Sequence, residues 1–586
     1  MIDVLFRRAW GEANAFLHRS RQLRWVDLLV LGGLVGAALG IHGVASQWTG
    51  PQRSEVAIDL SPLALPRYAL FSLSRGLIAY ALSLGFTLVY GYWAAKDRVA
   101  ERVLIPLLDI LQSIPILGFM PGLVLGLVRV FPTSNTGLEL AAVVMMFTGQ
   151  VWNMTFSFYH SLRAVPADLG EVGHVYRFTW WERLKWIELP FATLGLVWNS
   201  MMSMAGGWFF LMINEAFVLG AHDYRLPGIG SYMSVAVARG DVPAMLWAIL
   251  AMTLMIVALD QLLWRPVVVW AQKFRVEEGG ATEAMGSWFL DWLKHSRLIA
   301  FAQHLLRTAA ARRQQRLRER EARAAAPVRP APAPVTGVSS RFAFVPFVLV
   351  VALLLFGGIK LVFFLRAVKG SQWLMVIVSA LLTLARVLAS TAIGTLWALP
   401  AGLAIGLSPR LSRIFQPVIQ VAASFPAPML FPIVIAVLHA IGMPLGVGSI
   451  VLMLLGTQWY ILFNVIAGAM AIPADLKESA RSYRLGRIAR LRSLYIPAVF
   501  SYLVTGWVTA SGGAWNASIV SEYVSFKGHT IATIGVGAAI SQAAEKGDLP
   551  GLAAGVLVLS TMVMVFNRNV WRRCYRVAEE RFSLNR

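Results

Sequence analysis

The sequence predicts an all-α integral membrane protein made of two tandem six-helix units in parallel orientation, with about 12 transmembrane helices. Three observations lead to this prediction. The 586 residues are 57% hydrophobic and 14% charged, whereas a soluble domain carries about 25% charged residues. Apolar runs long enough to cross roughly 30 Å of hydrocarbon recur along the chain. The second half of the chain also repeats the first.

Each unit contains six such apolar runs. In the first unit, residues 1–275 with a core at 60–270, they lie near 25–45, 69–94, 103–131, 138–160, 190–216 and 243–270. In the second unit, residues 341–586 with a core at 375–570, they lie near 342–365, 374–407, 415–442, 447–470, 497–521 and 550–567. Lipid offers no hydrogen-bond partner to an unpaired backbone group, so each run is expected to be a helix.

The formal net charge of +22 would favour nucleic acid as the partner of a soluble protein. Here the basic residues gather in the N-terminal arm, around 96–102, around 163–185 and in the C-terminal tail. All four lie on one side if every apolar run crosses once, and Lys and Arg accumulate on the cytoplasmic side of a bilayer. We therefore expect a multi-pass protein of the inner (cytoplasmic) membrane with both termini in the cytoplasm, and no nucleic-acid partner.

Residues 276–340 differ from the units on either side. Seven arginines lie between 307 and 323, and an Ala/Pro run follows from Ala324 to Val335. The first part is expected to be a basic surface helix beside anionic lipid headgroups, and the second a semi-rigid linker in the cytoplasm.

The internal repeat is clearest in a polar segment. Residues 165–190 read VPADLGEVGHVYRFTWWERLKWIELP and residues 472–497 read IPADLKESARSYRLGRIARLRSLYIP, with ten identities at an offset of 307. The same offset pairs Glu215 with Glu522, and an upstream offset of 311 pairs Arg75 with Arg386. Because each copy has an even number of spans, both point the same way. This predicts a pseudo-two-fold axis along the membrane normal and a pathway between the units.

These two segments resemble the cytoplasmic loop of binding-protein-dependent ABC permeases. The family pattern is Glu-Ala-Ala, three residues, Gly, nine residues, Ile, one residue, Leu-Pro. The first segment matches it at Glu171, Ile187, Leu189 and Pro190, and the second at Glu478, Ala480 and Pro497, with Leu494 and Ile496 at the aliphatic positions. Both depart from the pattern at its glycine, where Arg177 and Arg484 stand, and the first has Val172-Gly173 in place of the alanines.

The resemblance implies that each loop couples the permease to an ATPase subunit. Acidic residues near the start of the predicted short helix favour its N-terminus, and proline is well suited to the first turn of the next span. The residues assigned to coupling are Asp168, Glu171, Gly173, Arg177, Pro190, Asp475, Glu478, Ala480, Arg484 and Pro497. The alternative is an ordinary amphipathic surface helix.

The resemblance also implies the partners. No Gly-x-x-x-x-Gly-Lys-Ser/Thr phosphate loop occurs in the chain, so ATP and Mg are expected on two separate ATP-binding cassette subunits at the cytoplasmic side. A substrate-binding protein is expected on the other side, and lipids around the spans. The single cysteine, Cys574, shows no metal-ligand spacing, so the chain is expected to hold no metal or cofactor and to be no enzyme.

Polar and helix-breaking residues inside the spans are the candidates for a translocation pathway. Proline removes a backbone hydrogen bond, and polar groups at membrane depth need a partner. The candidates are Gln112, Ser113, Pro115, Gln150, Trp152, Glu215, Gln420, Ser424, Pro426, Gln458, Trp459 and Glu522. Packing kinks, hydrogen bonds between helices and, for the two glutamates, capping of the next Gly-rich turn remain open as alternatives.

The function implied by the resemblance is ATP-driven import of a small solute. The segments after Glu215 and Glu522 are similar to those of nitrate, sulfonate, taurine and bicarbonate-type permeases, which favours an anion. Basic residues at His222, Arg225, Lys527 and His529 would attract one. Amino acids or another small solute are the alternative substrates. An ion-coupled secondary transporter would not need the loop twice, and no residue constellation suggests a membrane enzyme.

Overall fold

The structure is a computed structural model. It describes residues 25–50, 57–219, 222–274, 286–296, 308, 355–526 and 529–582. The N-terminal arm, the arginine cluster at 307–323 apart from Thr308, and the Ala/Pro run lie outside these residues.

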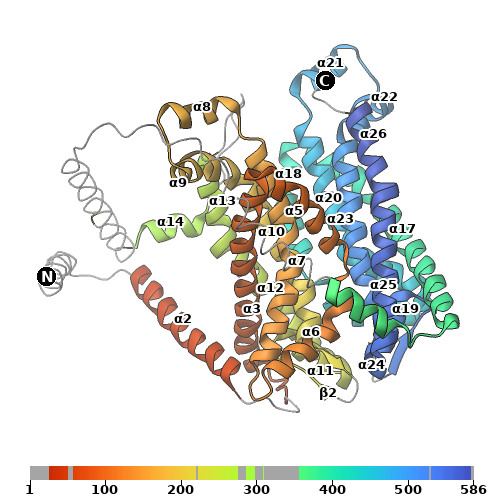
Figure 1. The fold of residues 1–586 in the computed structure, drawn as a ribbon. Coiled ribbons are helices and arrows are strands. Elements are labelled where there is room, and N and C mark those ends of the chain that lie inside the picture. The colour runs from red at the N-terminus through yellow and green to blue at the C-terminus, as the bar shows by residue number, and fades with distance from the viewer. Residues whose placement is uncertain are drawn as a thin grey trace, which may run out of the picture.

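The first unit begins with α2 (Trp25–Thr49) and continues through helices that run between the two ends of the bundle (Figure 1). The elements up to the fifth span are α3 (Leu65–Phe86), α4 (Tyr92–Lys96), α5 (Arg98–Ser113), α6 (Ile116–Val130), α7 (Thr136–Arg163), α8 (Ala167–Val175), α9 (Trp180–Arg183) and α10 (Leu189–Glu215). Those that follow are β1 (Val218–Leu219), β2 (His222–Asp223), α11 (Ile229–Arg239), α12 (Val242–Leu259), α13 (Arg265–Ala271) and α14 (Trp288–Lys294).

The second unit repeats this order. An apolar helix at Leu355–Leu365 precedes it. Its elements are α17 (Gly370–Gly406), α18 (Pro409–Ser424), α19 (Phe431–Ala440), α20 (Leu445–Ala471), α21 (Ala474–Ser482), α22 (Arg487–Arg490), α23 (Ile496–Ser521), β3 (Tyr523–Phe526), β4 (His529–Ala532), α24 (Val536–Lys546), α25 (Leu549–Phe566) and α26 (Arg572–Phe582). Single π-helical turns recur at matching places, at Leu184–Glu188 and Leu491–Tyr495 and at Asp260–Trp264 and Asn567–Trp571.

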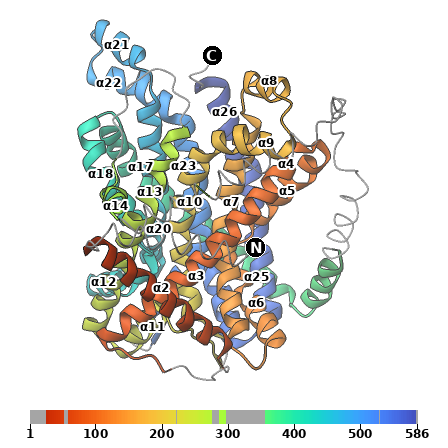
Figure 2. The same ribbon diagram turned by 90° about the vertical axis from the view of Figure 1, so that its left-hand side faces the viewer.

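Both units point the same way. The short helices α8, α9, α21 and α22 lie at one end of the bundle, and α11 and α24 lie at the other (Figures 1 and 2). This arrangement confirms the prediction of two tandem parallel units of helices.

The third span of each unit is broken. The sequence has helix-breaking prolines inside the runs at 103–131 and 415–442, and the chain bends there: α5 and α6 meet at 94°, and the corresponding pair in the second unit meets at 80°. Proline forces the residue before it out of the helical region. Ile114 before Pro115 has ψ 121° and Phe425 before Pro426 has ψ 129°, so the chain turns at both places.

Seven described helices are long and apolar enough to cross a membrane, or nine if each bent pair counts as one span. The set is smaller than the twelve runs partly because α7 is not in it. This 28-residue helix has the length of a span, but Glu139, Gln150 and Asn153 lower its mean hydropathy. The run at 342–365 is described only from residue 355.

The sequence pattern did not predict strands. After the fifth span of each unit the chain forms a short antiparallel hairpin, β1 with β2 and β3 with β4. Each hairpin lets the chain turn back so that the next helix begins at a glycine-rich segment.

The two units share their hydrophobic cores. One cluster combines Trp208 and Met204 of α10 with Met429 of the second unit, and another combines Met120 of α6 with Trp515 of α23. Helices α10 and α12 contact α18 across the interface, α23 contacts α6, and α25 contacts α5 and α6. The space between the units is therefore lined by the broken third spans together with the fifth and sixth spans.

Candidate functional site

The two predicted coupling loops form exposed helices at the same end of the molecule (Figure 1). Asp168 and Asp475 lie in the first turn of α8 and α21, where a carboxylate interacts favourably with the helix N-terminus. The side chains of Glu171 and Glu478 are exposed. Gly173 and Ala480 are buried against the underlying chain, and a side-chain carbon on Gly173 would lie 3.2 Å from Ile187.

The end of each coupling helix keeps a glycine-type turn without glycine. Arg177 and Arg484 have φ of 51° and 50°, and they are the non-glycine residues with positive φ in the described chain. The residue after each arginine donates its N–H to the carbonyl of the residue five positions earlier, Phe178 to Gly173 at 2.8 Å and Leu485 to Ala480 at 3.2 Å. This is the Schellman pattern, which favours glycine at the left-handed position. The shared arginine therefore preserves the turn at some cost in backbone strain.

Below the first coupling loop lies a buried ion-pair cluster. Glu188, 1% exposed, is 2.6 Å from Lys96 Nζ and 3.0 Å from Arg183 Nε. Lys96 is the last residue of α4, at the end of the second span, and Arg183 belongs to α9. A single carboxylate thus connects the coupling loop to the second span. Pro190 and Pro497 follow in the first turn of α10 and α23.

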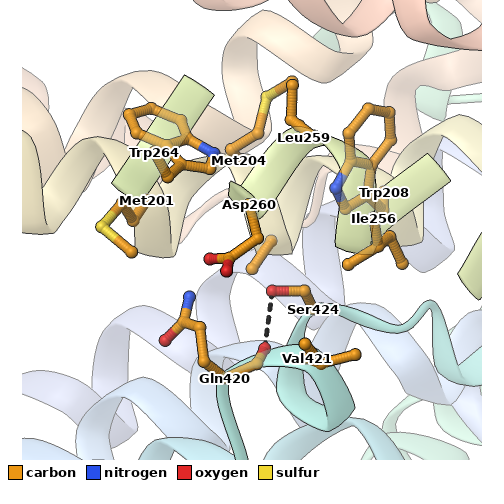
Figure 3. Close-up of a pocket in the computed structure, with 11 residues that line it drawn as sticks. Met201, Met204, Trp208, Ile256, Leu259, Asp260, Trp264, Gln420, Val421 and Ser424 are labelled. Atoms are coloured by element: carbon orange, nitrogen blue, oxygen red, sulfur yellow. Dashed lines mark hydrogen bonds between the residues drawn. The ribbon is translucent and has the colours of Figure 1, made fainter. Parts of the chain in front are cut away.

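A small pocket lies between the two units (Figure 3). The first unit lines it with residues of α10, α12 and the following π-helical turn, including Trp208, Asp260 and Trp264, and the second unit with Gln420, Val421 and Ser424 of α18. The carboxylate of Asp260 faces the side chain of Gln420 across the pocket. The cavity volume is about 10 Å³, which is enough for about one water molecule, so the units are closely packed here.

At the positions that correspond to Asp260 and Gln420 in the other unit, an amide replaces the acid and an acid replaces the amide. At the offset of 307, Asp260 corresponds to Asn567, and at the offset of 311, Gln420 corresponds to Asp109. Helices α12 and α18 contact each other, as do α25 and α5, so each of the two contacts has one carboxylate and one amide at these corresponding positions. The two units differ in which helix carries the charge.

The other predicted pathway residues do not line this pocket. Gln150 is fully buried between α7 and α10 and donates to the sulfur of Met204 at 3.6 Å. Trp459 donates to the carbonyl of Leu455, one turn back in its own helix. Gln112 donates to Asp109 at 2.7 Å. Trp152 and Gln458 are half-buried, and Ser113 is the last residue of α5.

Pro115 and Pro426 precede the second half of each broken span, and the first break also carries a contact between units. The N–H of Ile116, directly after Pro115, donates to Oδ1 of Asn516 on α23 at 2.8 Å. This hydrogen bond satisfies a backbone group that the broken helix leaves unpaired.

Glu215 and Glu522 are fully buried inside their own units and cap the next helix. Glu215 accepts from Arg75 at 2.6 Å, from Ser72 at 2.8 Å and from the N–H of Gly230 at 2.8 Å. Glu522 accepts the matching hydrogen bonds from Arg386 at 2.7 Å, Thr383 at 2.8 Å and Gly537 at 2.9 Å. The structure thus places both carboxylates in the capping role that was the alternative to a pathway role.

Of the four basic residues expected at the outer mouth, Arg225 lies 3.3 Å from Asp223, so its charge is partly neutralised. His529 is exposed on β4. Lys527 lies outside the described residues, as does the side chain of His222.

Three charged residues of these sites were not singled out from the sequence: Glu139, Glu188 and Asp260. Glu139 binds Arg75 through two hydrogen bonds of 2.6 Å. A carboxylate inside a predicted span was a usable signal for Glu139 and Asp260. Glu188 lies within the loop pattern at a position that the pattern leaves open. Within the described chain no group of three or more potential metal ligands gathers.

The family profile that matches this chain is described as "Binding-protein-dependent transport system inner membrane component", and it matches twice, at residues 87–263 and 394–570. The bicarbonate transport system permease protein CmpB of Synechococcus elongatus is 24% identical over 34% of this chain and 68% of its own length. The nitrate import permease protein NrtB of Leptolyngbya laminosa is 26% identical over 30% of this chain and 61% of its own length. The osmoprotectant import permease protein OsmW of Salmonella typhimurium is 26% identical over 36% of this chain and 93% of its own length.

Proposed function

The chain belongs to the family of binding-protein-dependent transport system inner membrane components, and from this premise we propose that it imports a small anion through a pathway between its two units. The family consists of permease subunits of ABC importers, so the chain is a multi-pass membrane transporter subunit and ATP is hydrolysed on other subunits. The observation that carries the proposal is the double match of the profile together with two loops at one end of the bundle.

One chain would then do the work of a permease dimer. Two ATP-binding cassette subunits, which bind ATP and Mg, dock on α8 and α21 at the cytoplasmic side. A substrate-binding protein docks at the opposite end, near the hairpins and α11 and α24. In this orientation the N- and C-termini are cytoplasmic. The exposed carboxylates of Glu171 and Glu478 are available to such partners without disturbing the fold beneath.

The substrate class rests on the names of relatives that transport bicarbonate and nitrate. The two tandem units differ in sequence, so the walls of the pathway are not identical, as they would be in a homodimer. Gln420 and Ser424 line the pocket between the units and are retained as pathway residues. The Ser424 hydroxyl donates to the backbone carbonyl of Gln420 at 2.8 Å, so the side-chain amide of Gln420 is the donor that suits a solute that accepts hydrogen bonds.

A second candidate substrate is a solute with a cationic group, such as an osmoprotectant. The observation that favours it is Asp260, a carboxylate beside Trp208 and Trp264 in the pocket between the units. Carboxylates and aromatic faces attract ammonium groups and repel anions. OsmW, an osmoprotectant permease by name, matches over most of its length.

The coupling proposal is tested by reversing two exposed charges. Cells express the chain together with its ATPase and binding protein, and uptake and ATPase association are measured. Glu171→Lys with Glu478→Lys should abolish both while the permease still inserts in the membrane. Lys546→Glu on α24, at the other end, changes a similarly exposed charge and should leave ATPase association intact. Unaltered uptake in the double variant would refute the assignment of the two loops.

The substrate candidates are separated by uptake of labelled nitrate, bicarbonate, taurine and glycine betaine. For an anion importer, Asp260→Asn leaves uptake unchanged or raises it, because a negative charge leaves the pathway. For an importer of solutes with a cationic group, the same change lowers uptake of glycine betaine about tenfold, the effect of losing about 1.4 kcal/mol.

A further inference from the structure

The ion-pair cluster beneath the first coupling loop is not repeated at the corresponding described residues of the second unit. Lys96 corresponds to Leu407 at the offset of 311, and Glu188 corresponds to Tyr495 at the offset of 307. Only the arginine is repeated, since Arg183 corresponds to Arg490. Leu407 and Tyr495 both pack against the apolar cluster around Ile472 and Ala498. The base of the second loop is therefore apolar where the first is ionic.

These two kinds of contact resist movement differently. A buried carboxylate held by two cations fixes the distance and direction between the groups that it joins, because an uncompensated buried charge is costly. Apolar contact is non-directional and depends mainly on the area that is buried. A loop joined to the second span by Glu188 moves that span with it, whereas a loop that rests on Leu407 and Tyr495 can slide.

We propose that Glu188 is a positioning residue that links the first coupling loop to the second span, so that the two coupling loops transmit ATP-driven movement unequally. The inference rests on the proposed function, since it requires that α8 and α21 receive the ATPase subunits. The first loop transmits movement through Arg183, Glu188 and Lys96 to the end of α4. The second loop transmits movement through packing alone.

The geometry makes Glu188→Gln an informative change. Glutamine has nearly the same shape, so the packing around the 1%-exposed side chain is kept while the charge is lost. Lys96 and Arg183 are 33% and 38% exposed, so water can solvate both cations after the change. The variant is therefore expected to fold and to bind its partners, with only the link between loop and span weakened.

The experiment uses the complete transporter, with its ATPase and binding protein, in proteoliposomes. The readout is the number of solute molecules moved per ATP hydrolysed, with the melting temperature of the complex measured in parallel. Glu188→Gln should lower this ratio at least fivefold, at the lower end of measured coupling between sites, while ATP hydrolysis and the melting temperature change little. Lys96→Met should give the same defect, and Lys96→Arg should not.

The second unit supplies the matched controls. Tyr495→Gln and Leu407→Met change the corresponding positions and should leave the ratio within twofold of the unaltered transporter. Lys96→Met and Glu188→Gln combined should be no worse than either alone, because they remove the same interaction.

Two results would overturn the inference: an unchanged ratio in Glu188→Gln, or additive effects of the two changes. A fall in melting temperature with an unchanged ratio would do so as well, since it would indicate a structural role only. Failure of the proposed function looks different, because the unaltered complex would then bind no ATPase or move no solute.

Discussion

The two buried Arg–Glu pairs allow the same glutamate-to-glutamine change to be compared in two places, one with a second carboxylate near the arginine and one without. Arg75 with Glu215 and Arg386 with Glu522 occupy matching positions in the two units. The first unit adds Glu139, whose counterpart at the offset of 307 is Gly446. In the second unit the carbonyl of Gly446 accepts from Arg386 at 3.1 Å instead. We predict that Glu522→Gln destabilises the protein more than Glu215→Gln.

The magnitude follows from what each arginine retains. After Glu215→Gln, Arg75 still holds both oxygens of Glu139 at 2.6 Å. The cost is then that of the lost cap hydrogen bonds, about 1–3 kcal/mol. After Glu522→Gln, Arg386 is 12% exposed and keeps only neutral acceptors, such as the carbonyl of Ile534 at 2.8 Å. Leaving a buried charge unpaired costs about 3–5 kcal/mol, so the difference is about 2 kcal/mol.

The assay is thermal unfolding of the purified permease in detergent. A unit of about 200 residues shifts its melting temperature by roughly 2–4 °C per kcal/mol, so Glu522→Gln should melt about 4–8 °C below Glu215→Gln. Glu139→Gln is the control, because Arg75 then keeps Glu215 and the loss should again be mild. Equal melting temperatures for the two variants, or a lower one for Glu215→Gln, would refute the reasoning that the extra carboxylate compensates.

Three further changes test other parts of the structure. Arg177→Gly and Arg484→Gly should each stabilise the end of a coupling helix by about 1 kcal/mol, because glycine tolerates the left-handed conformation. The expected readout is slower amide hydrogen exchange in α8 and α21, and faster exchange would contradict the prediction. Gly230→Ala should cost well over 1 kcal/mol in thermal unfolding, since the new carbon would lie 2.7 Å from the Met212 carbonyl. A carbon added at Gly240 would meet no atom within 4 Å, but the residue has φ of 67°, so Gly240→Ala should cost only about 1 kcal/mol. Equal losses of stability in the two variants would argue against close packing at Gly230. Asn516→Ala should weaken the contact between the units by about 1–3 kcal/mol, because the Ile116 N–H loses its acceptor. After proteolysis of the linker, the two halves should dissociate more readily than in the unaltered protein. Unchanged dissociation would count against that hydrogen bond.

Most of the fold could be predicted because its signals are local. The apolar runs identify the helices, and the prolines at 115 and 426 lie where the third spans break. The hairpins after α10 and α23 could not be predicted in the same way. They are short, and their pairing depends on the orientation of the helices on either side.

The residues proposed for the pathway lie in different parts of the structure. Gln420 and Ser424 line the pocket between the units, whereas Gln150 and Trp459 make contacts elsewhere. The roles of the coupling residues and pathway residues stay predictions. Asp260 and Glu188 gain their meaning only from residues distant in the sequence, Gln420 in one case and Lys96 in the other.

The sequence by itself determined the membrane class, the duplication, the parallel orientation and the position of the two loops. These properties depend on composition, run length and spacing, which need no knowledge of contacts. The tertiary structure decided which face of each span meets the other unit and which charges meet. In a bilayer, lipid is as apolar as the helix interface, so hydrophobic periodicity does not indicate how a helix is rotated about its axis. Packing sets that rotation, and with it the pairing of Glu188 with Lys96 and of Arg75 with Glu139.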